Sequence, residues 1–208
     1  MMIRRSFCVV ILSLVAVSAV AQEAGDKIVS IAQAADHAVQ ESKLTLAGDV
    51  PFAGQRQRLM AEYFATAADV HRLTGELPED ADQHDTADGR GKSAEESAAR
   101  LARMLGRDLA SAELAAWRGL AHHLAECQRR LVQDAMDRVL SRGLLPAAAP
   151  VIGAGVGRFL LPEIARRLKR PYRDFADLMQ GDLALREWAA RAAPAAAVAG
   201  LLSPVIPA

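Results

Sequence analysis

The chain has 208 residues, enough for one domain with a small second lobe, and 51% of them are hydrophobic, so a buried core can form. Only 4% are aromatic and the formal net charge at pH 7 is zero, which argues against a single-stranded nucleic-acid platform and against a nucleic-acid partner in general. The two cysteines are Cys8 and Cys127. Since Cys8 lies in an N-terminal apolar run, we expect no structural disulfide.

The first 21 residues have the pattern of a secretory signal peptide. Arg4 and Arg5 give a basic start, and the apolar stretch over residues 7–17 is too short to span a bilayer comfortably. Small residues precede a cleavage position after Ala21. Residues 1–21 therefore predict export to the periplasm. The alternatives are a buried hydrophobic strand and a misassigned start of translation.

Residues 22–47 carry no recognisable chemistry, and the sequence Gly-Asp-Val-Pro at 48–51 predicts a break after them. Residues 55–73 then place apolar side chains at helical spacing and predict an amphipathic helix. Asp69 lies on this expected helix three positions after Thr66, so the two side chains share a face.

Residues 74–93 form a polar stretch that is longer than most connections inside a compact domain, which indicates a lid, a binding loop or disorder. Asp80, Asp82 and His84 have a spacing that can hold a divalent cation, but the EF-hand pattern is absent. The sequence favours a solvated acidic loop, and we expect no metal site.

Two helices are predicted next. Ser93 and Glu96 form a capping box that begins a helix ending at Gly106. A longer helix is expected from Ser111 to Gly143, with an apolar stripe along one side. At 1.5 Å per residue, its roughly 30 residues would span about 45 Å.

A glycine-rich turn follows the long helix and is the most informative stretch of the chain. Val151 and Ile152 indicate the end of a strand, and Pro162 with Glu163 is typical of a first helical turn. Between them stand Gly153, Gly155 and Gly157. Such a strand–turn–helix can direct backbone N–H groups at a phosphate. The alternative is a tight turn that serves packing alone, because the spacing is not that of the dinucleotide fingerprint.

The C-terminal part of the chain predicts a short helix or extended segment over residues 169–179 and an alanine-rich helix over residues 183–202. Pro194 is expected to kink this helix or to begin a separate one. Its small side chains allow a close approach to a neighbour, and we expect that neighbour to be the glycine turn.

Six stretches of the sequence carry a family resemblance. They are VPFAG at 50–54, LMAEYFATAADV at 59–70, LTGELP at 73–78, TADGRGKS at 86–93, GAGVGRF at 153–159 and APAAAVA at 193–199. Together they resemble the hydantoinase/oxoprolinase-type proteins of the tetrahydromethanopterin- and methanofuran-linked one-carbon pathway. The similarity covers residues 48–202 and leaves residues 203–208 as a tail.

The resemblance implies a sugar kinase–actin-like (ribonuclease H-like) fold, in which two lobes hold a nucleotide or a phosphorylated ligand between them. This chain would supply a single helix-rich α/β lobe, the second of the two. Archaeal relatives join an aminomethylfuran unit, activated as a diphosphate, to the phenol of glutamyl-tyramine during methanofuran synthesis. By this similarity the candidate ligand- or phosphate-binding residues are Gly153, Gly155, Gly157, Arg158, Asp69 and Asp88.

The family begins with an Asp-x-Gly-[Thr/Ser] phosphate hairpin in its first lobe, and no such sequence occurs here. One lobe alone does not enclose a ligand, so it can neither hold a phosphate group from both sides nor exclude water from it. The resemblance therefore predicts a lobe that is inactive alone, and its catalytic residues stay unidentified. A nucleotide or phosphorylated ligand would bind only with the missing lobe supplied by a partner chain. Whether Mg²⁺ binds together with this ligand is left open.

The alternative function is a non-catalytic binding or interaction protein. A lobe without its neighbour would expose an apolar face, and such faces favour association with a partner or with a second copy. The resemblance favours the cytoplasm, where the substrates of the pathway are made, whereas the signal-like pattern favours export.

Overall fold

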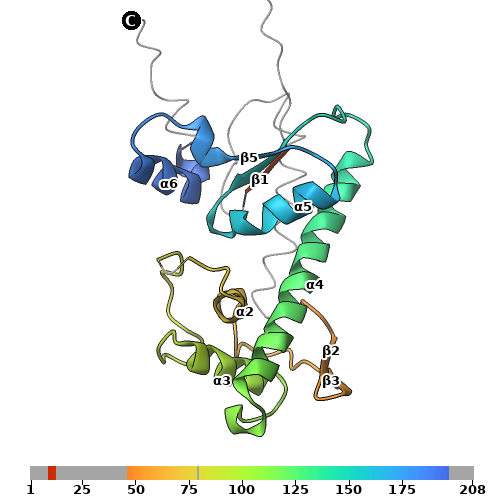
Figure 1. The fold of residues 1–208 in the computed structure, drawn as a ribbon, viewed down its shortest axis with the longest axis vertical. Coiled ribbons are helices and arrows are strands. Elements are labelled where there is room, and N and C mark those ends of the chain that lie inside the picture. Colours follow the sequence, from red (N-terminus) through yellow and green to blue (C-terminus); the bar gives the residue numbers. More distant parts are fainter. Residues whose placement is uncertain (1–8, 13–45, 79, 197–208) are drawn as a thin grey trace, which may run out of the picture. The chain divides into compact units, whose positions relative to one another are not determined.

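The computed structural model describes residues 9–12, 46–78 and 80–196, which form a mixed α/β structure (Figure 1). The predicted α/β class is confirmed. The chain divides into two compact units: unit 1 comprises residues 1–39 and 133–208, and unit 2 comprises residues 40–132. The long helix α4 (Leu114–Leu140) contributes residues to both units, and it confirms the long helix that the sequence predicts over 111–143.

Unit 1 is built on a three-stranded parallel sheet. The strands are β1 (Val9–Leu12), β4 (Val151–Ala154) and β5 (Tyr172–Asp174), in the order β1-β4-β5. All four residues of β4 are buried, as expected of a central parallel strand with a neighbour on each side. Helix α5 (Leu161–Arg167) connects β4 to β5 and packs against both strands (Figure 1).

Strand β1 comes from the stretch with the signal-peptide pattern. For Val9–Leu12 the structure agrees with the alternative interpretation of this stretch as a hydrophobic strand. The rest of residues 1–21, the segment 22–45 and the tail 203–208 lie outside the described residues, so export stays a prediction. Among the helices of the described part of the chain, none is both long and apolar enough to cross a membrane.

The predicted strand, glycine turn and helix occur in the expected order, with one addition. A five-residue 3₁₀ helix, η2 (Val156–Leu160), lies between the turn at Gly155 and α5. The chain then continues through the 3₁₀ helix η3 (Phe175–Leu178) to α6 (Leu183–Arg191). Helical structure is interrupted at Ala192 and resumes at 193–196, which confirms the expected break near Pro194.

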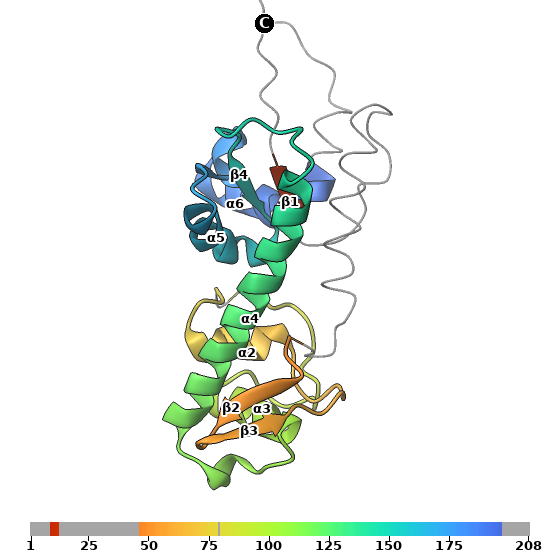
Figure 2. The same cartoon turned by 90° about the vertical axis from the view of Figure 1, so that its right-hand side faces the viewer.

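Unit 2 begins with a β-hairpin that the sequence analysis did not predict. Strands β2 (Asp49–Phe52) and β3 (Gln55–Arg58) pair antiparallel across a two-residue turn (Figure 2). Ala53 and Gly54 have φ angles of 50° and 75°, and positive values at both turn positions are the mark of the type I′ turns that favour hairpins. The expected helix over 55–73 is therefore wrong for residues 55–66, and α2 (Ala67–Thr74) accounts for its end.

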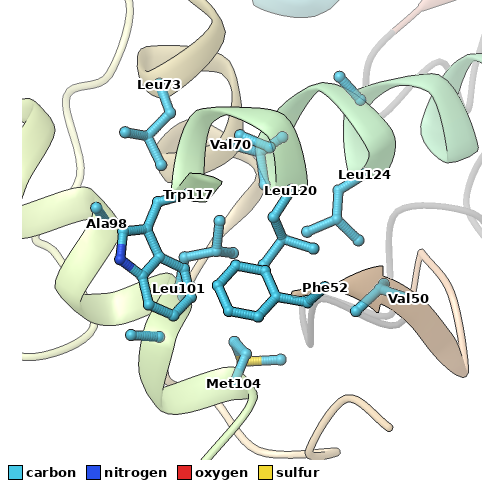
Figure 3. Packing of buried hydrophobic residues seen from close by; sticks show 14 residues of the cluster. Val50, Phe52, Val70, Leu73, Ala98, Leu101, Met104, Trp117, Leu120 and Leu124 are labelled. Carbon is cyan, nitrogen blue, oxygen red and sulfur yellow. The ribbon is translucent and has the colours of Figure 1, made fainter. Parts of the chain in front are cut away.

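The core of unit 2 lies between the hairpin, α2, α3 (Ala94–Met104) and the first half of α4. Val50 and Phe52 alternate with exposed residues along β2 and so point into this core. The Phe52 ring stacks on Trp117, with ring centroids 4.4 Å apart (Figure 3). The Trp117 indole N–H donates to the carbonyls of Leu109 and Ala112, so the polar atom of this buried ring has partners.

Helix α3 begins as its sequence predicts. The Ser93 side chain accepts a hydrogen bond from the Glu96 amide at 3.2 Å, and the Glu96 carboxylate accepts one from the Ser93 amide at 2.9 Å. This reciprocal pair satisfies two N–H groups at the first turn, as a capping box does. The predicted capping box is confirmed.

Candidate functional site

The predicted site residues belong to two different units. Gly153, Gly155, Gly157 and Arg158 lie in unit 1, whereas Asp69 and Asp88 lie in unit 2. Each set has its own surroundings and is described separately below. That the two sets contact one ligand stays a prediction.

The glycine turn lies at the carboxyl ends of two parallel strands. Strand β4 ends at Ala154 and β5 ends at Asp174, and Gly153 pairs with Asp174 in the sheet register. In open parallel α/β sheets, ligands bind outside the carboxyl ends of the strands. Residues 155–158 therefore lie at the strand ends that face a ligand in such sheets, although the order β1-β4-β5 of the described strands has no reversal that would mark a topological switch point.

The three glycines differ in how much space they leave. A Cβ atom on Gly153 would come within 2.2 Å of the Tyr172 hydroxyl, so that side of the strand is filled by the tyrosine. Gly155 is buried with a φ of +81°, a conformation that glycine adopts without strain. A Cβ atom on Gly157 would meet nothing within 4 Å. Gly153 and Gly155 thus fit the packing interpretation, and Gly157 leaves room for another molecule.

Arg158 is held beside the turn by two carboxylates. Its Nε donates to Asp174 Oδ2 at 3.1 Å, and its Nη2 pairs with the Glu187 carboxylate. Nη1 points to the Gly155 carbonyl at 3.4 Å. The side chain is 15% exposed, and these contacts fix the direction of the guanidinium.

Helix α6 contacts the turn through one face. The Gly155 amide donates to the Ala190 carbonyl at 2.7 Å, and Glu187, three residues before Ala190, pairs with Arg158. Residues three apart share a helix face. The expected approach of the alanine-rich helix to the glycine turn is confirmed.

Three residues at this site were missed by sequence reasoning: Tyr172, Asp174 and Glu187. Asp174 Oδ2 accepts from the Tyr172 hydroxyl at 3.1 Å, and Oδ1 accepts from the Ala176 amide at 2.9 Å. Burial raises the pKa of Tyr172, and the neighbouring Asp174 raises it further. The spacing Tyr-x-Asp was the available signal, since it puts both side chains on one face of a strand.

In unit 2, Asp69 and Asp88 are joined by one buried arginine. Arg100 is fully buried, and it donates to Asp69 Oδ1 through Nε at 2.9 Å and to Asp88 Oδ1 through Nη1 at 3.0 Å. Arg103 also donates to Asp88, at 3.0 Å. Arg72 joins Asp69 to the loop, because it donates to Asp69 at 3.2 Å and to Asp82 at 2.6 Å. These six residues are called the arginine network below.

The expectation of a solvated acidic loop holds for the exposed Asp80, His84 and Asp85, and the arginine network corrects it for Asp82 and Asp88. The Asp82 and Asp88 side chains are 14% and 13% exposed, and each pairs with two or more basic residues. Among the described residues, no buried side-chain nitrogen or oxygen lacks a hydrogen-bond partner. The network therefore ties the loop over residues 75–92 to α2 and α3. Asp69 and Asp88 serve this packing in the structure, and their contact with a ligand stays a prediction.

The arginine network makes the stability of unit 2 depend on pH through Asp88. Burial alone raises the pKa of Asp88, but hydrogen bonds from the Arg90 amide and Arg100, and the charges of Arg100 and Arg103, outweigh it. The pKa therefore lies below its ordinary value of 3.8. A carboxyl with a lowered folded-state pKa stabilises the protein above its unfolded-state pKa and loses this contribution as the pH falls.

We expect the urea concentration at the unfolding midpoint of unit 2 to decrease when the pH is lowered below about 4, because Asp88 then takes up its proton. Asp88→Asn lowers the midpoint at neutral pH and makes the acid-induced fall smaller. Urea titrations monitored by tryptophan fluorescence at a series of pH values measure both effects. An unchanged pH dependence in Asp88→Asn would contradict this role.

No metal site is visible in the parts of the chain that the structure describes: no three His, Cys, Asp or Glu residues gather in a metal-binding group there. Asp82, from the cation-like spacing, pairs instead with Arg72 and Lys92. Both oxygens of Asp174 at the turn already accept hydrogen bonds. These hydrogen bonds fix the direction of the Asp174 carboxylate.

No protein-family model matches this sequence, and a search of curated proteins finds no significant match.

Proposed function

We propose that this protein binds a phosphorylated ligand at the turn over residues 155–158. We further propose that it is a relative of the hydantoinase/oxoprolinase-type proteins of the tetrahydromethanopterin- and methanofuran-linked one-carbon pathway. The six motif stretches support the kinship. The observation that carries the binding site is the position of Arg158 and Gly157 at the carboxyl ends of β4 and β5.

The chemistry of the turn suits an anionic group of modest size. An arginine fork can donate two parallel hydrogen bonds to phosphate oxygens, which gives direction as well as attraction. The open space at Gly157 lets a phosphate approach the backbone closely. Under this proposal the ligand is a phosphorylated aminomethylfuran or a nucleotide, bound by the second lobe of a sugar kinase–actin-like fold. Because Arg158 and Gly157 both belong to this chain, the proposal departs from the expectation that binding needs the missing lobe: the phosphate group binds to this chain alone, and a first lobe from a partner chain would be required for group transfer.

Binding of pyrophosphate, measured by isothermal titration calorimetry, tests this function. We expect saturable binding to the full chain and a loss of about tenfold or more in affinity for Arg158→Gln, since a charge-assisted hydrogen bond contributes about 1.5–3 kcal/mol. Arg166→Gln is the matched control, because Arg166 on α5 carries the same charge and is 73% exposed. Equal affinity for the wild type and both variants, or no binding at all, would contradict the proposal.

Three exposed apolar side chains on α6 favour self-association as a second candidate function. Leu183, Leu185 and Trp188 are 71%, 58% and 63% exposed. The chain has no net charge at pH 7, so charge repulsion between copies does not oppose their contact. Under this proposal two copies pair through α6. Sedimentation velocity over a range of protein concentrations should show a dimer that Trp188→Glu weakens. A monomer at every concentration would exclude this contact.

A further inference from the structure

The strongest unexplained feature of the turn is that the guanidinium proposed to bind phosphate already holds an anion. The Glu187 carboxylate from α6 pairs with Nη2 of Arg158. Each guanidinium nitrogen of Arg158 already has an acceptor, since Nε donates to Asp174 and Nη1 faces the Gly155 carbonyl, and a phosphate oxygen that approaches Nη2 meets the Glu187 carboxylate there. A ligand and Glu187 therefore compete for one edge of the guanidinium.

The two carboxylates on Arg158 differ in how firmly they are held. Asp174 has three hydrogen-bond donors around it, from Arg158, the Tyr172 hydroxyl and the Ala176 amide, and its side chain is 26% exposed. Glu187 is 38% exposed, and the contact seen for its carboxylate within the described residues is the one with Arg158. Displacing Asp174 would break a strand-end network, whereas displacing Glu187 releases one side chain into solvent.

We infer that Glu187 is an internal substitute for the anionic ligand. Its carboxylate pairs with Arg158 in the unliganded protein and leaves Arg158 when phosphate binds. This inference rests on the proposed function of the turn. The Gly155–Ala190 hydrogen bond holds the α6 backbone in place, so the exchange needs only a rotation of the Glu187 side chain. Asp174 stays bound and keeps the guanidinium directed at the ligand.

The exchange has two consequences. Without a ligand, the Glu187 carboxylate gives the partly buried guanidinium of Arg158 a charged partner, which offsets the cost of its desolvation and stabilises the turn. It also lowers the affinity for phosphate, because binding must break one ion pair and bring a second negative charge near the first. An exposed or half-exposed ion pair contributes up to about 1 kcal/mol, which corresponds to roughly a fivefold change in affinity.

Pyrophosphate titration of Glu187→Gln tests the inference. We expect this variant to bind pyrophosphate about fivefold more tightly than the wild type. Glu163→Gln is the matched control: Glu163 is a half-buried glutamate on α5 that pairs with Arg166 and Arg167, so its loss changes the net charge equally. The control should bind like the wild type.

The possible outcomes separate the inference from the proposed function. If the wild type binds pyrophosphate and Glu187→Gln binds no more tightly than Glu163→Gln, the internal substitute is refuted and the phosphate site stands. If neither the wild type nor Glu187→Gln binds, the proposed function fails and the inference fails with it. If Glu187→Gln binds more tightly than both the wild type and Glu163→Gln, and additional Arg158→Gln removes binding, both are supported.

Discussion

Arg100→Met is expected to lower the free energy of unfolding of unit 2 by about 3 kcal/mol, because it breaks a buried ion pair by removing one partner. Arg100 is fully buried and pairs with Asp69 and Asp88. Methionine fills much of the volume and supplies no donor. The loss is placed at the lower end of the range for such variants because Arg72 and Arg103 stay bound to the two carboxylates.

Urea denaturation at neutral pH measures this effect, with the fluorescence of buried Trp117 as the signal in a Trp188→Phe background. Arg130→Met is the control. Arg130 lies on α4, is 73% exposed and pairs with Glu126 one turn away, so its loss should cost less than about 0.5 kcal/mol. If Arg100→Met cost no more than this control, the arginine network would not be what holds the loop to α2 and α3.

Trp117→Ala is expected to have the largest effect in the hydrophobic core, a loss of about 3–5 kcal/mol. Trp117 is completely buried and stacks on Phe52, and its removal leaves a cavity beside Leu101 and Leu120 (Figure 3). It also removes the indole donor from the Leu109 and Ala112 carbonyls.

Urea denaturation followed by far-ultraviolet circular dichroism measures this loss without a tryptophan signal. Trp188→Ala is the matched control, because Trp188 is 63% exposed and its removal opens no cavity. We expect the control to stay within about 0.5 kcal/mol of the wild type. A similar loss in both variants would mean that Trp117 is not a core residue.

The parts of the fold that were predictable have strong local signals. The capping box at Ser93 and the apolar stripe of α4 each depend on residues a few positions apart, so the sequence alone indicates them. The strand before the glycine turn was likewise marked by Val151 and Ile152. In each case, propensity and periodicity agree with the final packing.

The hairpin was missed, and β5 was predicted only as one of two alternatives, because their signals are short. Strands β2 and β3 have four residues each and β5 has three, too few for alternation to stand out. The hairpin turn carries Ala53 at a positive φ, where asparagine or aspartate is the usual signal. The helical spacing of the apolar residues from Leu59 to Leu73 favoured a helix that tertiary packing overrode in its first part.

The partners of the candidate site residues come from distant parts of the chain. Glu187 lies 29 positions after Arg158, and Arg100 lies 31 positions after Asp69. No local pattern indicates such pairs, so the sequence left Asp69 and Asp88 as free candidates for ligand contact. The structure pairs both with arginines, and at the turn it adds carboxylates that compete with the expected ligand.

The most direct test of a phosphate site at the glycine turn is the nuclear magnetic resonance spectrum of the isotope-labelled chain during a pyrophosphate titration. We expect the largest shifts for the amides of Gly155, Val156, Gly157 and Arg158, with smaller shifts at Glu187. Shifts confined to the arginine network around Arg100, or a spectrum that does not change, would contradict ligand binding at the turn.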